Sequence, residues 1–414
     1  MKKAIVFFHA SQLGNNLHPF LTNEIELLRA SFDEVHLICL TASCGFAAIE
    51  KYSNVHIHSI KLRKLYSKLW YLFPELFNNY FWKDLSIALK NHIFDLEYIK
   101  KTVMLIICGR HFAHIAEKII KSDKTNTKWI LESYWLTGTA YAVSLLKKRH
   151  PGLVAFSRLH SSEADYIRNK YAICQYKSFI DKYLDYVFFV CENAKRQYQY
   201  IINKYYNNNI VPQKHVVNYL GVAKDNEIIT KKSSDGIFRI LSCSRLISLK
   251  RVDMLAEVFS QWKGKKILWT HIGTGEDLDY IKKIINKYDK NNNCVLLGDF
   301  SNKQVLEYYQ NEEVDVFINI SIYEGLPVSI MEAMSYGIPI IATDVGGTRE
   351  LVNTSDGILL QKDITQDDIQ TAINSLIDMN ENDYNELKKN AYKTYERMLK
   401  VNDNYIKLCK HINL

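Results

Sequence analysis

The chain has 414 residues, of which 47% are hydrophobic and 24% are charged, an ordinary composition for a globular protein with enough chain for two domains. Its formal net charge of +8 is modest for this length, and the one dense basic run is Lys61 to Lys68, so a nucleic-acid-binding protein is disfavoured. No apolar run in the sequence reaches the roughly 18 to 20 residues that a membrane-spanning helix needs.

The cysteines and the N-terminus both favour the cytoplasm. The 8 cysteines include no C-x-x-C pair, and several stand in or beside apolar runs, where free core thiols are common. The first residues, MKKAIVFFHASQ, carry two lysines and an apolar run that is too short for a signal peptide, so they predict a first strand. We therefore expect a cytoplasmic protein.

The first half of the chain alternates strands with helices, which is typical of a doubly wound α/β domain. Strands are predicted at residues 2–9, 34–40, 55–60, 128–133 and 153–160, and helices at 19–30 and 137–148. Ligands in such folds bind beyond the carboxyl ends of the strands. We therefore expect the loop that contains Gly14, and His160 at the end of its strand, to face a cleft. A lone histidine is more often structural, so His160 alone decides little.

Residues 61–73, KLRKLYSKLWYLF, predict a basic amphipathic helix. Four leucines at a 3-4-3 spacing form one apolar stripe, three lysines lie on another face, and aromatic residues continue as far as Trp82. Such a segment suits peripheral contact of residues 61–82 with an anionic membrane, here the inner face of the plasma membrane. Packing of the stripe against its own domain is an equally open alternative.

A polar stretch between residues 203 and 236 predicts a hinge, and a second α/β domain follows it. A strand is predicted at 239–246 and a helix at 251–262, with Arg245 closing the strand and Lys250 at the helix start. Two cations around a strand-to-helix loop can neutralise a diphosphate. A pair of surface cations is the commoner case, so this spacing alone is weak.

Other candidate motifs are less informative. Gly273-Thr274-Gly275-Glu276 lacks the third glycine and the trailing acid of a dinucleotide fingerprint, so NAD binding is poorly supported. His56 with His58, and His111 with His114, can each share a face, but nothing acidic or thiol-bearing completes a metal site with them. We read these histidines as structural and expect no metal site.

The stretch from Val314 to Leu351 carries the clearest chemistry. It predicts a buried strand at 314–320, a loop, a helix at 328–336 that stops at Gly337, a strand at 338–342 and a Gly346-Gly347 turn. Pro327 has the fixed φ that suits a first helical turn.

Two carboxylates bracket that helix start, Glu324 in the loop and Glu332 inside the helix. The free N–H groups of the first helical turn form an anion site between them, and Gly325 lets a ligand approach the backbone closely. A nucleotide sugar has a diphosphate between two groups that carry several hydroxyls, the sugar and the ribose. An anion site between two carboxylates matches this layout, because the carboxylates can accept the hydroxyls and the anion site can bind the diphosphate. Most pairs of glutamates at this spacing are surface residues, so the spacing is informative only in its strand–loop–helix setting.

Taken together, these motifs resemble the large retaining glycosyltransferase family four, which has the GT-B fold. The matching segments are SCSRLISLKRVDML, WTHIGTGEDL, LLGDFSNKQVLEYY and the 314–351 stretch, in that order, and they cover nearly all of the second domain. The first domain matches less fully, through SRLHSSEADY, CENAKRQY and YLGV, and looks similar to enzymes that build bacterial capsule, exopolysaccharide or O-antigen chains.

The resemblance implies a role for each matching residue. Arg245 and Lys250 would hold the donor diphosphate, Glu324 would contact the transferred sugar, and Glu332 the ribose hydroxyls. His160 and the Gly14 loop would complete the site, although Gly14-Asn15-Asn16 departs from the Gly-Gly pair of many relatives and leaves the acceptor contacts open. The remaining donor-site residues would be Gly273, Gly275, Glu276, Asp299, Phe300, Gly325, Leu326, Pro327, Val328 and Ser329.

The resemblance also implies the architecture and the reaction. We expect two Rossmann-like domains facing across a cleft, residues 1–222 on the acceptor side and 223–394 on the donor side, with a helix at 395–414 returning to the first domain. We expect a metal-independent, anomer-retaining transfer from a UDP- or GDP-linked sugar, without a cofactor, to a growing lipid-linked surface glycan. A nucleotide-sugar epimerase or phosphorylase on the same fold, or a non-catalytic partner subunit, are the alternatives.

Overall fold

The computed structural model describes residues 2–13, 19–41, 52–61, 68–207, 211–224 and 229–413. The chain divides into two compact units. The first unit comprises Met1–Asn218 and Leu408–Leu414, and the second comprises Tyr219–Lys407. Within the described ranges, no helix combines the length and the apolar character needed to cross a bilayer.

The first unit is built on a parallel sheet whose seven described strands run in the order β3-β2-β1-β4-β5-β6-β7. Each neighbouring pair is parallel, and β1 lies between β2 and β4. The strands are β1 (Lys2–Leu13), β2 (Glu34–Thr41), β3 (Val55–Lys61), β4 (Thr127–Ser133), β5 (Val154–Leu159), β6 (Tyr186–Phe189) and β7 (His215–Val217).

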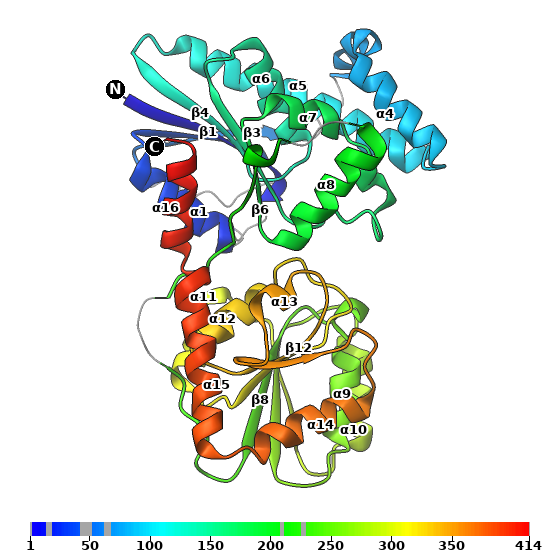
Figure 1. Ribbon diagram of the computed structural model, residues 1–414, viewed down its shortest axis with the longest axis vertical. Coiled ribbons are helices and arrows are strands. Elements are labelled where there is room, and N and C mark those ends of the chain that lie inside the picture. The colour runs from blue at the N-terminus through cyan, green and yellow to red at the C-terminus, as the bar shows by residue number, and fades with distance from the viewer. Residues whose placement is uncertain are drawn as a thin grey trace. The chain divides into compact units, whose positions relative to one another are not determined.

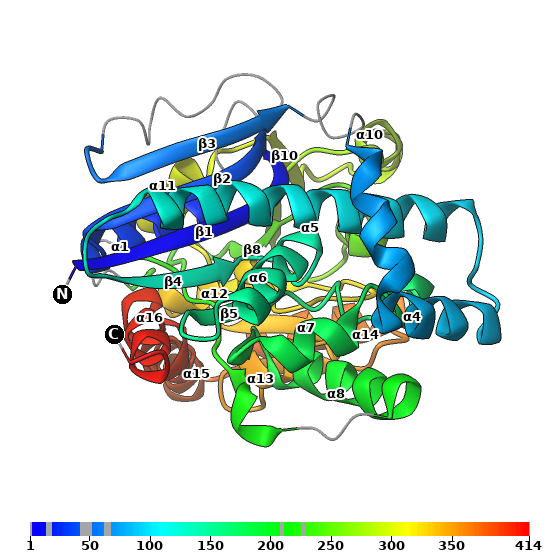
Figure 2. The same ribbon diagram turned by 90° about the horizontal axis from the view of Figure 1, so that it is seen from above.

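Helices cover this sheet. The longest, α5 (Leu96–Ser122), runs beside β1 and β2 (Figure 2), and its Phe112 ring stacks on Phe8 of β1 with the centroids 6.5 Å apart. Its N-terminus is capped by Asp95, whose carboxylate accepts the Tyr98 N–H at 2.8 Å, a contact worth about 1 kcal/mol. The other helical segments are α1 (Pro19–Ser31), η1 (Leu69–Phe77), α4 (Asn79–Lys90), α6 (Gly138–Arg149), η2 (Lys170–Ile173), α7 (Lys177–Tyr183), α8 (Glu192–Tyr206) and η3 (Pro212–Lys214).

The second unit repeats the plan with a parallel sheet whose six described strands run in the order β10-β9-β8-β11-β12-β13. Figure 1 shows α9, α10 and α14 on one side of this sheet and α11, α12 and α15 on the other. The strands are β8 (Phe238–Cys243), β9 (Ile267–Ile272), β10 (Cys294–Gly298), β11 (Val316–Asn319), β12 (Ile340–Thr343) and β13 (Gly357–Leu360). The helical segments are η4 (Ser248–Lys250), α9 (Val252–Ser260), α10 (Leu278–Tyr288), α11 (Asn302–Asn311), α12 (Val328–Ser335), α13 (Thr348–Leu351), α14 (Gln366–Ile377) and α15 (Glu381–Thr394).

Buried apolar side chains from both layers form the core of the second unit. Trp269 on β9 is fully buried beside Phe259 of α9, and its indole N–H donates to Ser242 Oγ at 2.8 Å, so the one polar atom of the ring is satisfied. The strand residues Ile318 and Ile341 complete the same cluster. This core holds the strand ends, and therefore the loops beyond them, in fixed positions.

The end of the chain belongs to both units. A π-helical segment, η5 (Tyr395–Leu399), is followed by α16 (Val401–His411), and the first unit takes in the chain from Leu408 onward. There Leu408 and Ile412 are buried, and Lys128 Nζ of β4 donates to Asn413 O at 2.7 Å. The last turn is thus packed into the first unit.

One predicted element is wrong. Residues 61–73 were expected to form a single amphipathic helix, but β3 runs to Lys61 and a 3₁₀ segment, η1, covers Leu69–Phe77; the residues from 62 to 67 lie outside the described ranges. Pro74 explains part of the difference, because a proline disfavours helical backbone at the residue before it and cannot donate an intrahelical hydrogen bond.

Candidate functional site

In the second unit, two loops meet beyond the carboxyl ends of neighbouring strands. Strand β8 lies between β9 and β11, so the strand order reverses here, and the loops after β8 and β11 leave adjacent strands. The loops touch, because the Ile322 N–H donates to Leu249 O at 2.9 Å. Such a switch point is where open α/β sheets usually bind ligands.

Lys250 and Glu324 form an ion pair across these two loops. Lys250 Nζ donates to Glu324 Oε1 at 2.6 Å, and the same oxygen accepts from Asn319 Nδ2 at 3.1 Å and from Ser321 Oγ at 2.7 Å. Oε2 of Glu324 receives no hydrogen bond from the described residues. Three donors on one oxygen fix the orientation of the carboxylate, while its second oxygen stays available to a ligand hydroxyl.

Helix α12 begins directly after this loop. Its N-cap is Pro327, which offers no side-chain cap, and the first intrahelical bond runs from the Met331 N–H to Pro327 O at 3.3 Å. The N–H groups of Val328, Ser329 and Ile330 therefore have no acceptor within the helix. A helix N-terminus with unused N–H groups attracts anions such as phosphate.

Glu332 lies inside α12 and is buried. Asn302 Nδ2, at the start of α11, donates to Glu332 Oε1 at 2.6 Å. Burial raises the pKa of Glu332 to about 7, against which the Asn302 hydrogen bond acts only in part. Burial disfavours the ionised form of this carboxyl group, and hydrogen bonds donated by ligand hydroxyls would favour it again.

Two glycines let the loops after β8 and β9 approach each other. A Cβ on Gly273, whose φ is +141°, would stand 1.9 Å from Ser244 O, and one on Gly275 would stand 2.2 Å from Leu246 O. The Leu246 N–H donates to Thr274 O at 3.0 Å across the same contact. The G-x-G pattern is therefore required for packing.

A third glycine shapes the loop that carries Glu324. Gly346 adopts a φ of +56° in the turn after β12, and a Cβ there would stand 1.6 Å from Glu324 O. The neighbouring Gly347 N–H donates to Gly325 O at 2.8 Å. The Gly-Gly turn thus supports the backbone of the Glu324 loop.

Among the described residues, the side chains of Arg245, Glu276, Asp299 and Phe300 form no hydrogen bond or ion pair with Lys250 or Glu324. Arg245 is exposed at the end of β8 and forms no ion pair with the described residues. Glu276 and Asp299 are also exposed, on the loops after β9 and β10, and Phe300 beside Asp299 is half-buried. Their position at carboxyl strand ends agrees with the expectation, but a contact with a ligand remains a prediction.

In the first unit, His160 follows β5 directly. Its Nε2 is 3.0 Å from Tyr134 O, and its ring lies 4.3 Å from that of Trp135. The predicted loop around Gly14 lies outside the described residues.

The same sheet contains a buried cluster of charged side chains. Arg158 of β5 lies between Glu24 Oε1, 2.6 Å from its Nη2, and Glu132 Oε1, 3.2 Å from its Nε. Burial raises the pKa of Glu132 to about 8.

Sequence reasoning missed several residues that hold the site in place. Asn319 and Ser321 orient Glu324, and Asn302 binds Glu332, as described above. The buried His271 joins Ser242 Oγ, 2.8 Å from its Nδ1, to Ser244 O, 3.1 Å from its Nε2. The sequence does show polar residues at the ends of apolar strands, and this was a signal that could have found them. It does not show their hydrogen-bond partners, because these depend on the order of the strands in the sheet.

Comparison with known proteins identifies the second unit. Residues 224–394 match the model of the family described as "Glycosyl transferases group 1". These residues form a group 1 glycosyltransferase domain. O-antigen biosynthesis glycosyltransferase WbnH of Escherichia coli is 33% identical over 178 residues, which cover 43% of this chain and 47% of WbnH. Amylovoran biosynthesis glycosyltransferase AmsK of Erwinia amylovora is 31% identical over 122 residues, 28% of this chain and 30% of AmsK.

The chain thus spans about half the length of the first curated relatives it matches, or less. Solved structures match throughout. The lipopolysaccharide outer core galactosyltransferase WaaB in its apo form gives a TM-score of 0.68 at 17% identity, covering 98% of both chains. Anabaena Alr3699/HepE in complex with UDP-glucose gives 0.66 at 13% identity, covering 99% of both. The fold of two Rossmann-like domains is therefore the GT-B fold, as predicted.

Proposed function

We propose that the protein is a retaining, metal-independent glycosyltransferase that moves a sugar from a nucleotide diphosphate sugar to a growing glycan. The observation that carries this proposal is the Lys250–Glu324 ion pair at the start of helix α12. A cation, a carboxylate and unused helix N–H groups are the parts needed to hold a diphosphate next to a sugar.

We assign each residue the role that the family resemblance implies, and the contacts described above support this assignment. Lys250 and the first-turn N–H groups of α12 receive the diphosphate and stabilise the charge on the departing nucleotide, with Arg245 as a second cation. Oε2 of Glu324 accepts hydroxyl groups of the transferred sugar. Glu332 accepts the ribose hydroxyls, and the loops with Gly275 and Phe300 surround the base. The first unit supplies the acceptor side, including His160.

The transfer itself exchanges one bond for another. The bond between the anomeric carbon and the diphosphate oxygen breaks, and a bond forms from the same face to the oxygen of the acceptor hydroxyl. The hydroxyl proton passes to the departing phosphate. Because Lys250 and a helix N-terminus offset the phosphate charge, the step needs no metal.

Related proteins support the choice of substrates. Anabaena Alr3699/HepE binds UDP-glucose, and an E. coli protein 34% identical over 102 residues is named a UDP-Gal:alpha-D-GlcNAc-diphosphoundecaprenol alpha-1,3-galactosyltransferase. We therefore propose a UDP- or GDP-linked donor and a lipid-linked acceptor in the O-antigen, capsule or exopolysaccharide class.

The test is transfer and donor binding with a panel of UDP-, GDP- and ADP-sugars. At least one donor should raise the melting temperature, since a ligand that binds the native state stabilises it. Glu324→Ala and Lys250→Ala should each abolish transfer without unfolding the protein, whereas the exposed Lys282→Ala should not. Full activity of the first two variants contradicts the proposal. Donor consumption without acceptor would favour an epimerase or phosphorylase, and binding without turnover a partner subunit.

We further propose that residues 61–82 contact an anionic membrane. Segment η1 is anchored through its buried Glu75, which accepts hydrogen bonds from Arg110 Nε at 2.6 Å and Tyr141 OH at 2.7 Å. Around this anchor, large apolar side chains are exposed, at Leu69, Trp70, Phe73, Leu76, Phe77 and Trp82. This apolar surface follows the basic Lys61–Lys68 run in the sequence, and the two features together match the chemistry of an anionic bilayer surface.

Flotation with phosphatidylglycerol-containing vesicles tests this contact. The double variant Trp70→Ser, Phe77→Ser and the triple variant Lys61→Glu, Lys64→Glu, Lys68→Glu should each reduce vesicle binding. The control is Ile406→Ser, which changes another exposed apolar residue, on α16. Unchanged binding of both multiple variants contradicts membrane contact and leaves the proposed transfer intact.

A further inference from the structure

Three histidines and a glutamate gather at the edge of the first unit's sheet, away from its carboxyl strand ends. The edge strand β3 pairs with β2 so that His36 lies opposite His56, and His58 follows two residue pairs later on the same face. Glu34 opens β2 on that face. Strand pairing thus places Glu34 and a third imidazole next to His56 and His58, which the order of residues in the sequence does not show.

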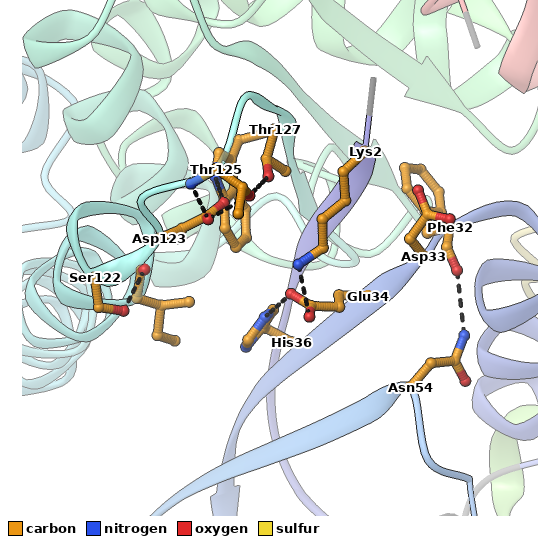
Figure 3. A network of polar contacts seen from close by, with 12 residues as sticks. Lys2, Phe32, Asp33, Glu34, His36, Asn54, Ser122, Asp123, Thr125 and Thr127 are labelled. Carbon is orange, nitrogen blue, oxygen red and sulfur yellow. Dashed lines mark hydrogen bonds and ion pairs between the residues drawn. The ribbon is translucent and has the colours of Figure 1, made fainter.

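The ring of His36 is at the centre of this cluster. It stacks on His56 and on His58, with centroids 4.9 Å and 5.4 Å away. Its Nδ1 is 3.1 Å from His58 Nε2, which leaves Nε2 directed toward Glu34 Oε2, 3.6 Å away. Among the described residues this buried Nε2 has no hydrogen-bond partner. Figure 3 shows His36 and Glu34 facing each other.

The geometry points to a binding site for a divalent transition metal of the zinc type, formed by Glu34, His36 and His56. One ligand atom of each residue lies within 4.8 Å of the other two. Ligand atoms on a tetrahedral zinc stand about 3.3 Å apart, so side-chain rotations that bring these atoms closer by up to about 1.5 Å would close the site. Two imidazoles and one carboxylate leave a further position for water, and this ligand set also suits nickel and copper.

The charges around the cluster are compatible with such an ion. Lys2 Nζ forms an ion pair with Glu34 Oε1 at 2.7 Å, whereas Oε2 of the same carboxylate faces His36. The Lys2 hydrogen bond lowers the pKa of Glu34, and burial together with the neighbouring imidazoles lowers the pKa of His36 to about 4. Asp33 and Asp123 also lie near Lys2 and offset its charge.

The site would act on the edge of the sheet. Among the described strands β3 pairs only with β2, and a metal shared between His56 of β3 and two residues of β2 would cross-link these two strands. Because the ligands stand at the amino ends of their strands, the ion would take no part in the proposed transfer.

Calorimetric titration of the EDTA-treated, untagged full chain with ZnCl₂ and NiCl₂ tests this inference. The wild type should bind one equivalent, and His56→Ala should weaken binding at least tenfold, since His56 is exposed and its loss should not unfold the unit. Glu34→Gln should weaken binding as well. The matched control is His92→Ala, another exposed histidine, which should bind like the wild type.

Trp129 reports where the ion sits. Its ring centroid is 5.5 Å from that of His36, so Ni²⁺ bound at the cluster should quench part of the tryptophan emission. The quenching should shrink in Trp129→Phe while the stoichiometry stays at one. Equal affinity in the wild type and His56→Ala, or no binding by the wild type, would overturn the site and leave the proposed function untouched.

Discussion

Glu324 and Glu332 belong to one motif, yet they have different hydrogen-bond partners. Glu324 receives three donors on one oxygen, one of them the Lys250 ammonium. Glu332 receives only the Asn302 amide, and burial raises its pKa to about 7. Without a ligand, Glu332 is therefore partly protonated near neutral pH, and ribose hydroxyls that donate to it would favour its ionised form.

This difference predicts a pH-dependent stability. The native pKa of Glu332, about 7, exceeds the ordinary value of 4.5, so the native state binds more protons than the unfolded state between these values. The wild type should lose stability as pH rises from 4.5 to 7, by on the order of 3 kcal/mol. Glu332→Gln keeps the acceptor for Asn302 and cannot ionise, so its advantage over the wild type should grow over that range.

Urea unfolding at several pH values measures this effect, with the exposed Glu312→Gln as control. A stability difference between Glu332→Gln and the wild type that does not change with pH would contradict the account.

At the scale of elements, the candidate site depends on loops that approach each other through glycine. Gly273 and Gly275 bring the loops after β8 and β9 together, and Gly346 supports the loop between β11 and α12. The two cations and the carboxylate of the site stand on these loops, so their relative positions follow from backbone contacts that a side chain would block.

Gly346→Ala should therefore damage both the fold and the site. Its Cβ would meet Glu324 O, so we expect a loss of about 3 kcal/mol or more together with weaker donor binding. Gly236→Ala is the matched control, since Gly236 has a φ of +81° and open space around it, and should cost about 1–2 kcal/mol from backbone strain alone. Chemical denaturation of both variants measures these losses of stability. Equal losses in Gly346→Ala and Gly236→Ala would show that the contact of the added Cβ with Glu324 O has no effect on stability.

At the scale of the whole molecule, the sequence predicts local elements in both units but not the contacts between residues that are distant in the chain. Apolar periodicity predicts the strands of both except β7 (His215–Val217), and the 314–351 motif predicts the helix that begins at Val328 and the residues around it, because these signals are local. The donors to Glu324 and the Glu34–His36–His56 cluster depend on which strands are neighbours, and a single sequence does not show this.

The last turn of the chain is a long-range contact of this kind. Leu408 and Ile412 are buried in the first unit, and the His411 ring lies 6.0 Å from Phe188 of β6. Ending the chain after Lys407 should therefore lower hydrogen-exchange protection in β4 to β7 more than in β8 to β12, because the first unit loses apolar burial. The exposed Lys410→Ala should leave both sheets unchanged. Equal loss in both sheets would contradict the assignment of Leu408–Leu414 to the first unit.

Calorimetric binding of UDP and GDP tests the central claim most directly, that Lys250 and the start of α12 hold a nucleoside diphosphate. The wild type should bind at least one of the two, and Lys250→Ala should weaken that binding at least tenfold, while Lys282→Ala binds like the wild type. Equal affinity of Lys250→Ala and the wild type, or no binding of either nucleotide by the wild type, would contradict the account.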